Sequence, residues 1–170
     1  VTEKFERFYH KENSKTSLSN NKIWSLLIDK TNKLWVGTDD GFNLYNSKSK
    51  TFKVYQPDPK NAYAIKGKSV NAIAEDASGN LWLGNWSNGL NKFDQKTKRF
   101  TNYMQKEIAD QKNPNDIWTL CIDNEGMIWI GCYWKGDLFR FDPEKEMFTT
   151  YNSGNTGNSA VFNILSLSAG

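Results

Sequence analysis

The sequence lacks several features that would place it in familiar functional classes. No apolar run approaches the ~20 residues that a membrane-spanning helix needs, and no signal peptide begins at Val1. Histidine occurs once, at His10, so we expect no metal site, no cofactor and no Ser–His catalytic pair. The 22 basic and 19 acidic residues leave a net charge of only +3. The lysines are scattered through polar segments rather than gathered on one basic face, which argues against nucleic-acid binding.

Cysteine is also scarce. Cys121 and Cys132 are the only two, too few for a disulfide framework. On the predicted strands Cys121 faces Trp129, whereas Cys132 faces Trp118. Alternation along a strand places positions 121 and 118 on opposite faces, so we expect two free, buried thiols.

Aromatic residues are abundant, at 14% of the chain with seven tryptophans, and they follow a repeat. Trp35, Trp82 and Trp129 are spaced 47 residues apart. The same spacing relates two further sets, Gly37, Gly84 and Gly131, and Asp29, Asp76 and Asp123. Because Trp35, Trp82 and Trp129 recur at one place in every repeat, we expect them to pack in the core.

Each repeat predicts four short strands. The first, as in residues 23–28, is rich in β-forming residues. A tight turn follows, in which an aspartate bonds the backbone and a residue with positive φ closes the turn. Asn32 stands where the other repeats have Gly79 and Gly126, and asparagine adopts that conformation most readily after glycine. Four antiparallel strands repeated every 40–50 residues or so are typical of a β-propeller, so we expect an all-β fold of propeller blades.

The repeat boundaries predict three complete blades and a partial strand at each end. The blades span 23–55, 70–103 and 117–151, the inter-blade loops span 10–22, 56–69, 104–116 and 152–160, and the partial strands are 1–9, the last of a preceding blade, and 161–170, the first of a following one. Three blades do not close a ring, since propellers usually have at least four. We therefore expect an incomplete propeller, taken from a longer protein or closed by another chain.

The second repeat, "VNAIAEDASGNLWLGNWSNGLNKFD", resembles the two-component-regulator propeller repeat, and the other two follow the same pattern. The resemblance implies a non-catalytic part of the periplasmic sensing region of a Bacteroides-type hybrid two-component protein, whose parent is a histidine kinase in the inner membrane. It implies that this region recognises an oligosaccharide signal, shapes the sensor dimer, or does both, to regulate transcription of polysaccharide-utilisation genes. It also implies the remaining blades as partners and leaves a homodimer open, with no membrane contact by this part.

Strand directions predict where a ligand would bind. The first strand of a blade lies innermost, and the loop before it emerges on the same face as the loop between the second and third strands. That second loop differs in length among the repeats, and binding residues concentrate on variable loops over a rigid frame. The candidates are Trp24, Asp39, Asp40, Asn71, Asn85, Trp86, Asn88, Trp118, Tyr133, Trp134 and Lys135.

Trp86 and Trp134 lie off the repeated tryptophan positions, so we interpret them as ligand contacts. An indole face stacks on a sugar ring, while Asn, Asp and Lys bind hydroxyl or acidic groups. The alternative, that these rings pack on a neighbouring blade or subunit, stays open.

Two other functional classes remain as alternatives. A protein-interaction propeller is one, although the Trp-Asp and Gly-His pairs of WD repeats are absent. A carbohydrate-active enzyme is the other. The Asp-box of sialidase-type propellers has Asp-x-Gly-x-x-Trp spacing, whereas Asp76, Gly79 and Trp82 are one residue too far apart. No convincing acid–base carboxylate pair is present.

Overall fold

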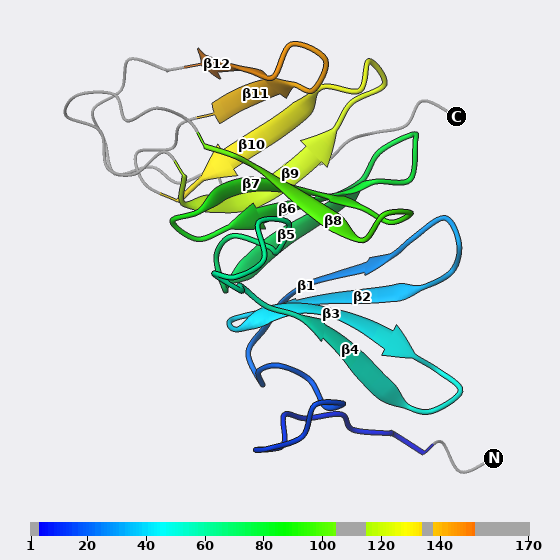
Figure 1. Cartoon of the computed structure of the whole chain (residues 1–170). Coiled ribbons are helices and arrows are strands. Elements are labelled where there is room, and N and C mark those ends of the chain that lie inside the picture. Colours follow the sequence, from blue (N-terminus) through cyan, green and yellow to red (C-terminus); the bar gives the residue numbers. More distant parts are fainter. Residues whose placement is uncertain (1–3, 105–114, 134–137, 152–170) are drawn as a thin grey trace.

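The computed structural model describes residues 4–104, 115–133 and 138–151, which form three four-stranded antiparallel sheets (Figure 1). Each sheet pairs its strands in chain order, and we call the sheets blades 1, 2 and 3. Blade 1 holds β1 (Ile23–Ile28), β2 (Leu34–Thr38), β3 (Gly41–Asn46) and β4 (Thr51–Tyr55); blade 2 holds β5 (Val70–Glu75), β6 (Leu81–Asn85), β7 (Gly89–Asp94) and β8 (Arg99–Tyr103); blade 3 holds β9 (Ile117–Ile122), β10 (Ile128–Cys132), β11 (Leu138–Asp142) and β12 (Met147–Tyr151). The sheets follow one another without closing a ring, which confirms an all-β, incomplete propeller.

An Asp–Trp clasp closes the turn between the first two strands of every blade. In blade 1, Asp29 Oδ1 accepts hydrogen bonds from the backbone N–H groups of Thr31 (2.9 Å) and Lys33 (3.0 Å). Asp29 Oδ2 accepts one from Trp35 Nε1 at 2.8 Å. The same indole bond joins Trp82 to Asp76 at 2.9 Å and Trp129 to Asp123 at 2.7 Å. The recurring aspartate and tryptophan of the sequence are therefore one structural unit.

The turn inside each clasp has the predicted backbone. Asn32 has φ 62°, and its counterparts Gly79 and Gly126 have φ 81° and 80°. All three lie in the left-handed region that favours glycine or asparagine.

Blades 1 and 2 each bury the clasp tryptophan against the blade that follows. Trp35 is fully buried, stacked on Phe42 with ring centroids 4.7 Å apart, and meets Phe93 of blade 2 edge-on at 5.6 Å. Trp82 is 1% exposed and contacts Phe141 of blade 3 at 5.8 Å. The prediction of core packing is confirmed for these two rings. Trp129 of blade 3 is half-buried.

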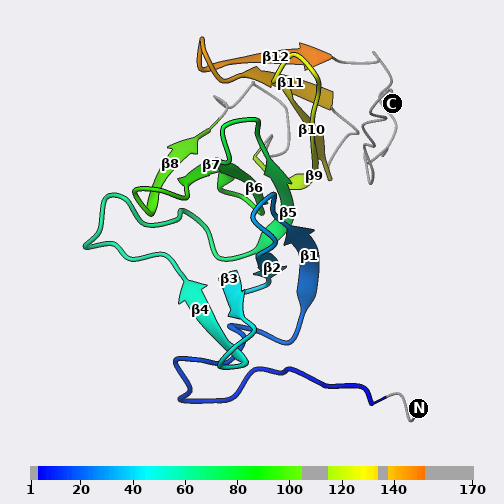
Figure 2. The ribbon, with the colours of Figure 1, turned by 90° about the vertical axis from the view of Figure 1, so that its right-hand side faces the viewer.

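The first strands lie together, as Figure 2 shows for β1, β5 and β9, while β4, β8 and β12 lie farther out. The second-strand glycines allow this approach. A Cβ on Gly37 would collide with the Val70 carbonyl oxygen, and one on Gly84 with the Ile117 side chain. The innermost position predicted for the first strand of each blade thus follows from close contact between neighbouring blades.

The predicted partial strands at the two ends stay predictions. Residues 4–9 form no strand, because a last strand needs the third strand of its own blade as a partner and the described residues contain none. Phe8 instead packs edge-on against Tyr45 (5.1 Å) and Phe52 (5.7 Å) of blade 1. Residues 161–170 lie outside the described residues.

Both cysteines are buried and neither forms a disulfide, as predicted. Cys121 pairs with Trp129 across β9 and β10, also as predicted, but Cys132 pairs with Ile117 rather than with Trp118. A β-bulge between Gly131 and Cys132 shifts the register there, and simple alternation along a strand does not include such an insertion.

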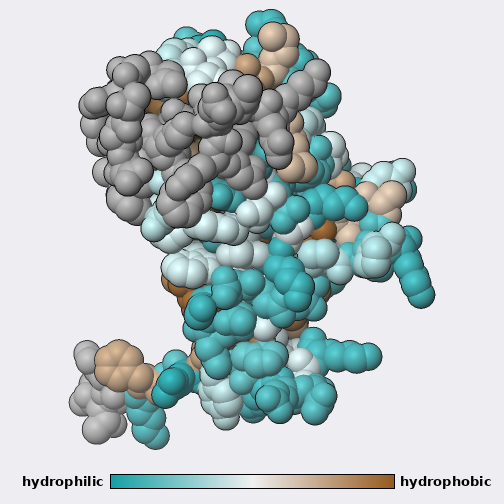
Figure 3. Space-filling view, turned by 90° about the vertical axis from the view of Figure 1, so that its left-hand side faces the viewer, coloured by the Kyte–Doolittle hydropathy of each residue, from teal (hydrophilic) through white to brown (hydrophobic). Residues whose placement is uncertain are grey.

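The surface seen in Figure 3 is mainly hydrophilic over the described residues, with small scattered apolar patches. Within those residues no helix is long and apolar enough to cross a membrane. The same part of the chain holds no group of three or more metal-ligating side chains.

Candidate ligand pocket on the propeller axis

Every blade carries a β-bulge near the start of its first strand. Between Ile23 and Ser25 the register skips Trp24, and the other two blades skip Asn71 and Trp118. A bulge leaves its extra residue out of the ladder and turns its side chain in a new direction. The three first-strand residues that were predicted to bind ligand are therefore the bulge residues, which are unpaired in the strand ladder.

A backbone hydrogen bond fixes the residue that follows the second strand of each blade. Its N–H donates to a carbonyl oxygen just before the first strand of the same blade. These bonds run from Asp39 to Lys22 (3.1 Å), from Trp86 to Ser69 (3.3 Å) and from Tyr133 to Asp116 (3.1 Å). Because the bond uses only main-chain atoms, the frame is the same in all blades while the side chain differs.

These bulge and loop positions surround one cavity of about 330 Å³, which we call the axial pocket. All three blades contribute to its wall. The lining residues are Trp24, Asp39, Ser69, Asn71, Trp86, Trp118 and Tyr133. Six of the eleven predicted residues are therefore brought together.

Four aromatic rings form one connected wall of the axial pocket. Trp118 is central, with ring centroids 5.6 Å from Trp24, 6.1 Å from Trp86 and 5.5 Å from Tyr133. Trp86 and Tyr133 also meet, at 5.3 Å. The Trp24–Trp118 contact joins blade 1 to blade 3 directly across blade 2. Trp24 is 43% exposed, and the other three rings are half-buried, so ring surface faces solvent.

The polar groups of the axial pocket are already oriented by hydrogen bonds. Asp39 Oδ1 accepts from Trp24 Nε1 at 3.2 Å, and Asp39 Oδ2 lies 3.4 Å from Lys22 Nζ. Ser69 Oγ donates to Asn71 Oδ1 at 2.7 Å, and Asn71 Nδ2 donates to the Ile117 carbonyl oxygen at 3.1 Å. The carboxylate, hydroxyl and carboxamide are thus held in place before any ligand arrives.

Three predicted residues lie elsewhere. Asp40 pairs with Lys68 at 3.1 Å and lines a different cavity. Asn85 is fully buried, because its carboxamide links the Ser69 carbonyl to Asn91 and so holds the frame. Asn88 packs its side chain against Gly67. These three residues were predicted to line the pocket because they lie next to pocket residues in the sequence. Adjacent residues on a strand or tight turn, however, point in different directions.

Trp134 and Lys135 lie outside the described residues, so their assignment stays a prediction. The sequence predicts that Trp86 lies in the loop whose length differs among the repeats. In the structure, Trp86 is instead at a fixed position, directly after the second strand. It occupies the position of Asp39 and Tyr133, at the same 47-residue spacing. Ser69 was not among the predicted site residues, although the same 47-residue spacing separates it from Lys22 and from Asp116.

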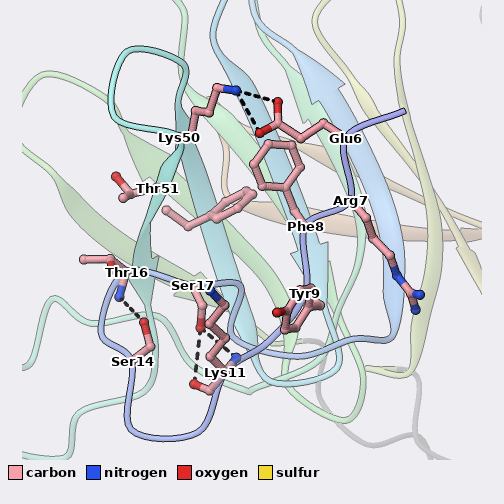
Figure 4. A pocket seen from close by; sticks show the side chains of 11 residues that line it. Glu6, Arg7, Phe8, Tyr9, Lys11, Ser14, Thr16, Ser17, Lys50 and Thr51 are labelled. Carbon is pink, nitrogen blue, oxygen red and sulfur yellow. Dashed lines mark hydrogen bonds and ion pairs between the residues drawn. The ribbon is translucent and has the colours of Figure 1, made fainter. Parts of the chain in front are cut away.

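A separate cavity of about 280 Å³ lies between the N-terminal segment and blade 1 (Figure 4). Lys50 Nζ contacts both carboxylate oxygens of Glu6, at 2.8 and 2.9 Å, and Ser17 Oγ bonds the backbone of Lys11. The first contact links the N-terminal segment to the β3–β4 turn and the second holds that segment together, so we interpret this cavity as structural.

Comparison with known proteins places the repeat in a family. The sequence model of the two component regulator propeller matches residues 17–40, 64–87 and 111–134, one match for each blade. A curated relative, histidine kinase P4 of Formosa agariphila, is 37% identical over 80% of this chain. The chain spans only 13% of that relative's length.

Solved structures share the fold. The extracellular domain of a hybrid two component system of B. thetaiotaomicron superposes with a TM-score of 0.73 and 22% identity, over 86% of this chain and 20% of that one. Virginiamycin B lyase of Staphylococcus aureus superposes with a TM-score of 0.58 and 14% identity, over 79% of this chain and 42% of the lyase. The fold alone therefore does not decide between binding and catalysis. The chain therefore carries three repeats of the two component regulator propeller family, one in each blade.

Proposed function

We propose that this chain is part of the periplasmic sensing region of a hybrid two-component histidine kinase, and that its axial pocket binds an oligosaccharide. The family match and the curated histidine kinase relative support the sensor assignment. In this proposal the ligand signal passes through the membrane-anchored parent to genes for polysaccharide use. The rest of the propeller is the structural partner of these blades, with a homodimer as a further arrangement of the sensor.

The observation that carries the ligand assignment is the axial pocket itself. Partly exposed indole and phenol rings stand beside a fixed carboxylate, hydroxyl and carboxamide, and all three blades contribute to this wall. The C–H face of a sugar packs on an aromatic ring while its hydroxyl groups bond to polar side chains. At about 330 Å³ the cavity is at the small end of the range for ligand sites, roughly 300–1,000 Å³.

A single substitution tests this site. We expect Trp86→Ala to weaken oligosaccharide binding about ten-fold or more, because an aromatic ring that packs against a ligand typically contributes about 1–2 kcal/mol. Isothermal titration calorimetry against di- to tetrasaccharides gives the affinity. The melting temperature, followed by circular dichroism, shows whether the blades stay folded.

Phe5→Ala is the matched control, because Phe5 is an aromatic residue that is 98% exposed and remote from the axial pocket. The Phe5→Ala variant should bind the oligosaccharide with the same affinity as the unmodified chain. Undiminished binding by a folded Trp86→Ala variant would show that the ligand binds elsewhere. Absence of binding by the unmodified chain to every saccharide would remove the ligand assignment altogether.

A further inference from the structure

The polar side of the axial pocket points to a chemical class of sugar. We propose that the pocket selects an uncharged, hydroxyl-rich saccharide and discriminates against saccharides that carry carboxylate or sulfate groups. This inference rests on the proposed function, since it concerns the same site. Its basis is the balance of hydrogen-bond donors and acceptors that the lining residues leave unused.

Among the non-aromatic side chains of the pocket wall, acceptors dominate that balance. Asp39 has about four lone-pair positions on its two oxygens, and only Trp24 Nε1 and Lys22 Nζ occupy them in the structure. Ser69 donates its single hydroxyl proton to Asn71, so Ser69 Oγ faces a ligand as an acceptor. Asn71 uses one amide N–H on the Ile117 carbonyl and keeps one for a ligand. A sugar hydroxyl donates a hydrogen bond to such acceptors, whereas an ionised carboxylate or sulfate has no proton to donate.

Charge acts in the same direction. Asp39 lies in the pocket wall, whereas its counter-ion Lys22 is not part of that wall and has a 70% exposed side chain. The Trp24 indole holds the Asp39 carboxylate toward the rings. An anionic group entering the pocket would therefore meet a fixed negative charge at short range, and like-charge contact is an effective means of rejecting a wrong ligand.

The other acidic side chains near this face do not line the axial pocket. Asp40 pairs with Lys68 at 3.1 Å and points into a different cavity. Asp116 is 4% exposed and accepts a hydrogen bond from Ser87 Oγ at 2.8 Å. Among the described residues, Asp39 is thus the charged side chain that lines the axial pocket.

The test compares matched neutral and acidic sugars on the unmodified chain and on Asp39→Asn. The neutral probes are gluco-, manno- and xylo-oligosaccharides, and the acidic probes are galacturono- and sulfated galacto-oligosaccharides, all as di- to tetrasaccharides. Titration calorimetry should give at least about ten-fold tighter binding of a neutral ligand. Asparagine keeps an acceptor but removes the charge, so the preference should narrow to about three-fold or less in Asp39→Asn. Asp40→Asn, which removes a neighbouring carboxylate outside the pocket, should retain the full preference.

The outcomes separate this inference from the proposed function. Tighter binding of acidic than of neutral sugars, abolished by Trp86→Ala, would overturn the inference and leave the sugar site standing. An unchanged preference in Asp39→Asn would also overturn it, because the selection would then not depend on that carboxylate. If no sugar of either class binds, both this inference and the proposed sugar-binding function are wrong.

Discussion

At the scale of single residues, the Asp–Trp clasp combines a buried charge with its own compensation. Burial raises the pKa of Asp29, but the hydrogen bonds donated by Trp35, Lys33 and Thr31 outweigh burial and lower the pKa from 3.8 to about 2. The pKa values of Asp76 and Asp123 are lowered in the same way, since the hydrogen bonds each accepts outweigh its burial. A carboxylate that stabilises the fold only when ionised links stability to pH.

The first prediction concerns acid stability. Between the folded pKa of Asp29, about 2, and its unfolded value of 3.8, the unfolded chain binds the extra proton, so lowering the pH favours unfolding. The stabilisation is complete above about pH 4 and is lost as the pH falls toward 2, by about 2 kcal/mol for this one residue. Urea unfolding at a series of pH values measures it.

Asp29→Asn supplies the comparison, because it removes the titrating group and retains an acceptor for the indole. We expect this variant to be less stable at neutral pH and to lose less stability on acidification. A pH dependence identical to that of the unmodified chain would show that Asp29 does not titrate in this range.

Residue-level sequence reasoning found much of the axial pocket, and its failures have physical reasons. Trp24, Trp118 and Tyr133 could be predicted because strand direction alone brings their positions to one face of the axis. Ser69 could not be recognised by its type, since a serine before a strand is usually a turn residue. Only its 47-residue spacing from Lys22 and Asp116 marks its position.

At the scale of strands and turns, the sequence predicts the regular parts well. All twelve strands agree with the expected order, and the turn at Asn32 has the expected positive φ. The bulges at Trp24, Asn71 and Trp118 were not predicted, because a bulge changes the pairing register without changing the apolar pattern of the strand. The Cys132 pairing was wrong for this reason.

The next prediction concerns the contact between neighbouring strands of blades 2 and 3. We expect Gly84→Ala to destabilise the chain by about 1–3 kcal/mol, because its methyl group would overlap the Ile117 side chain, which is 2% exposed and packed in the core between the two blades. Thermal and urea unfolding provide the measurement. Thr101→Ala is the control, since Thr101 is an exposed residue on β8 of the same blade, and it should change stability little. Equal stability of the two variants would mean that the blades do not pack through Gly84.

At the scale of the whole molecule, an apolar side of blade 1 is left open. Leu26 and Ile28 of β1 are 65% and 66% exposed, and an apolar cavity beside them is lined by Leu34, Val36 and Phe52 among others. Between blades 1 and 2 the corresponding surface is filled by side chains such as Phe93. Open apolar sheet surfaces of this kind promote association.

We therefore expect the isolated chain to associate as its concentration rises. Leu26→Lys with Ile28→Lys should shift the population toward monomer, because each lysine replaces exposed apolar surface with charge. Sedimentation velocity over a concentration series distinguishes the two states. A double substitution of exposed Lys48 and Lys60 by glutamine, away from β1, should leave association unchanged. An unmodified chain that is monomeric at every concentration would contradict the prediction.

The backbone bond that ties each second strand to the start of its own blade has an evolutionary consequence. Asp39, Trp86 and Tyr133 differ completely in size and charge, yet the same main-chain link holds each of them in place. When a gene segment for one blade is duplicated, the copy retains this backbone hydrogen bond together with the four strands of the blade. Point mutations at these positions then change the chemistry of the axial pocket without disturbing the blades, so the pocket can diverge while the fold stays the same.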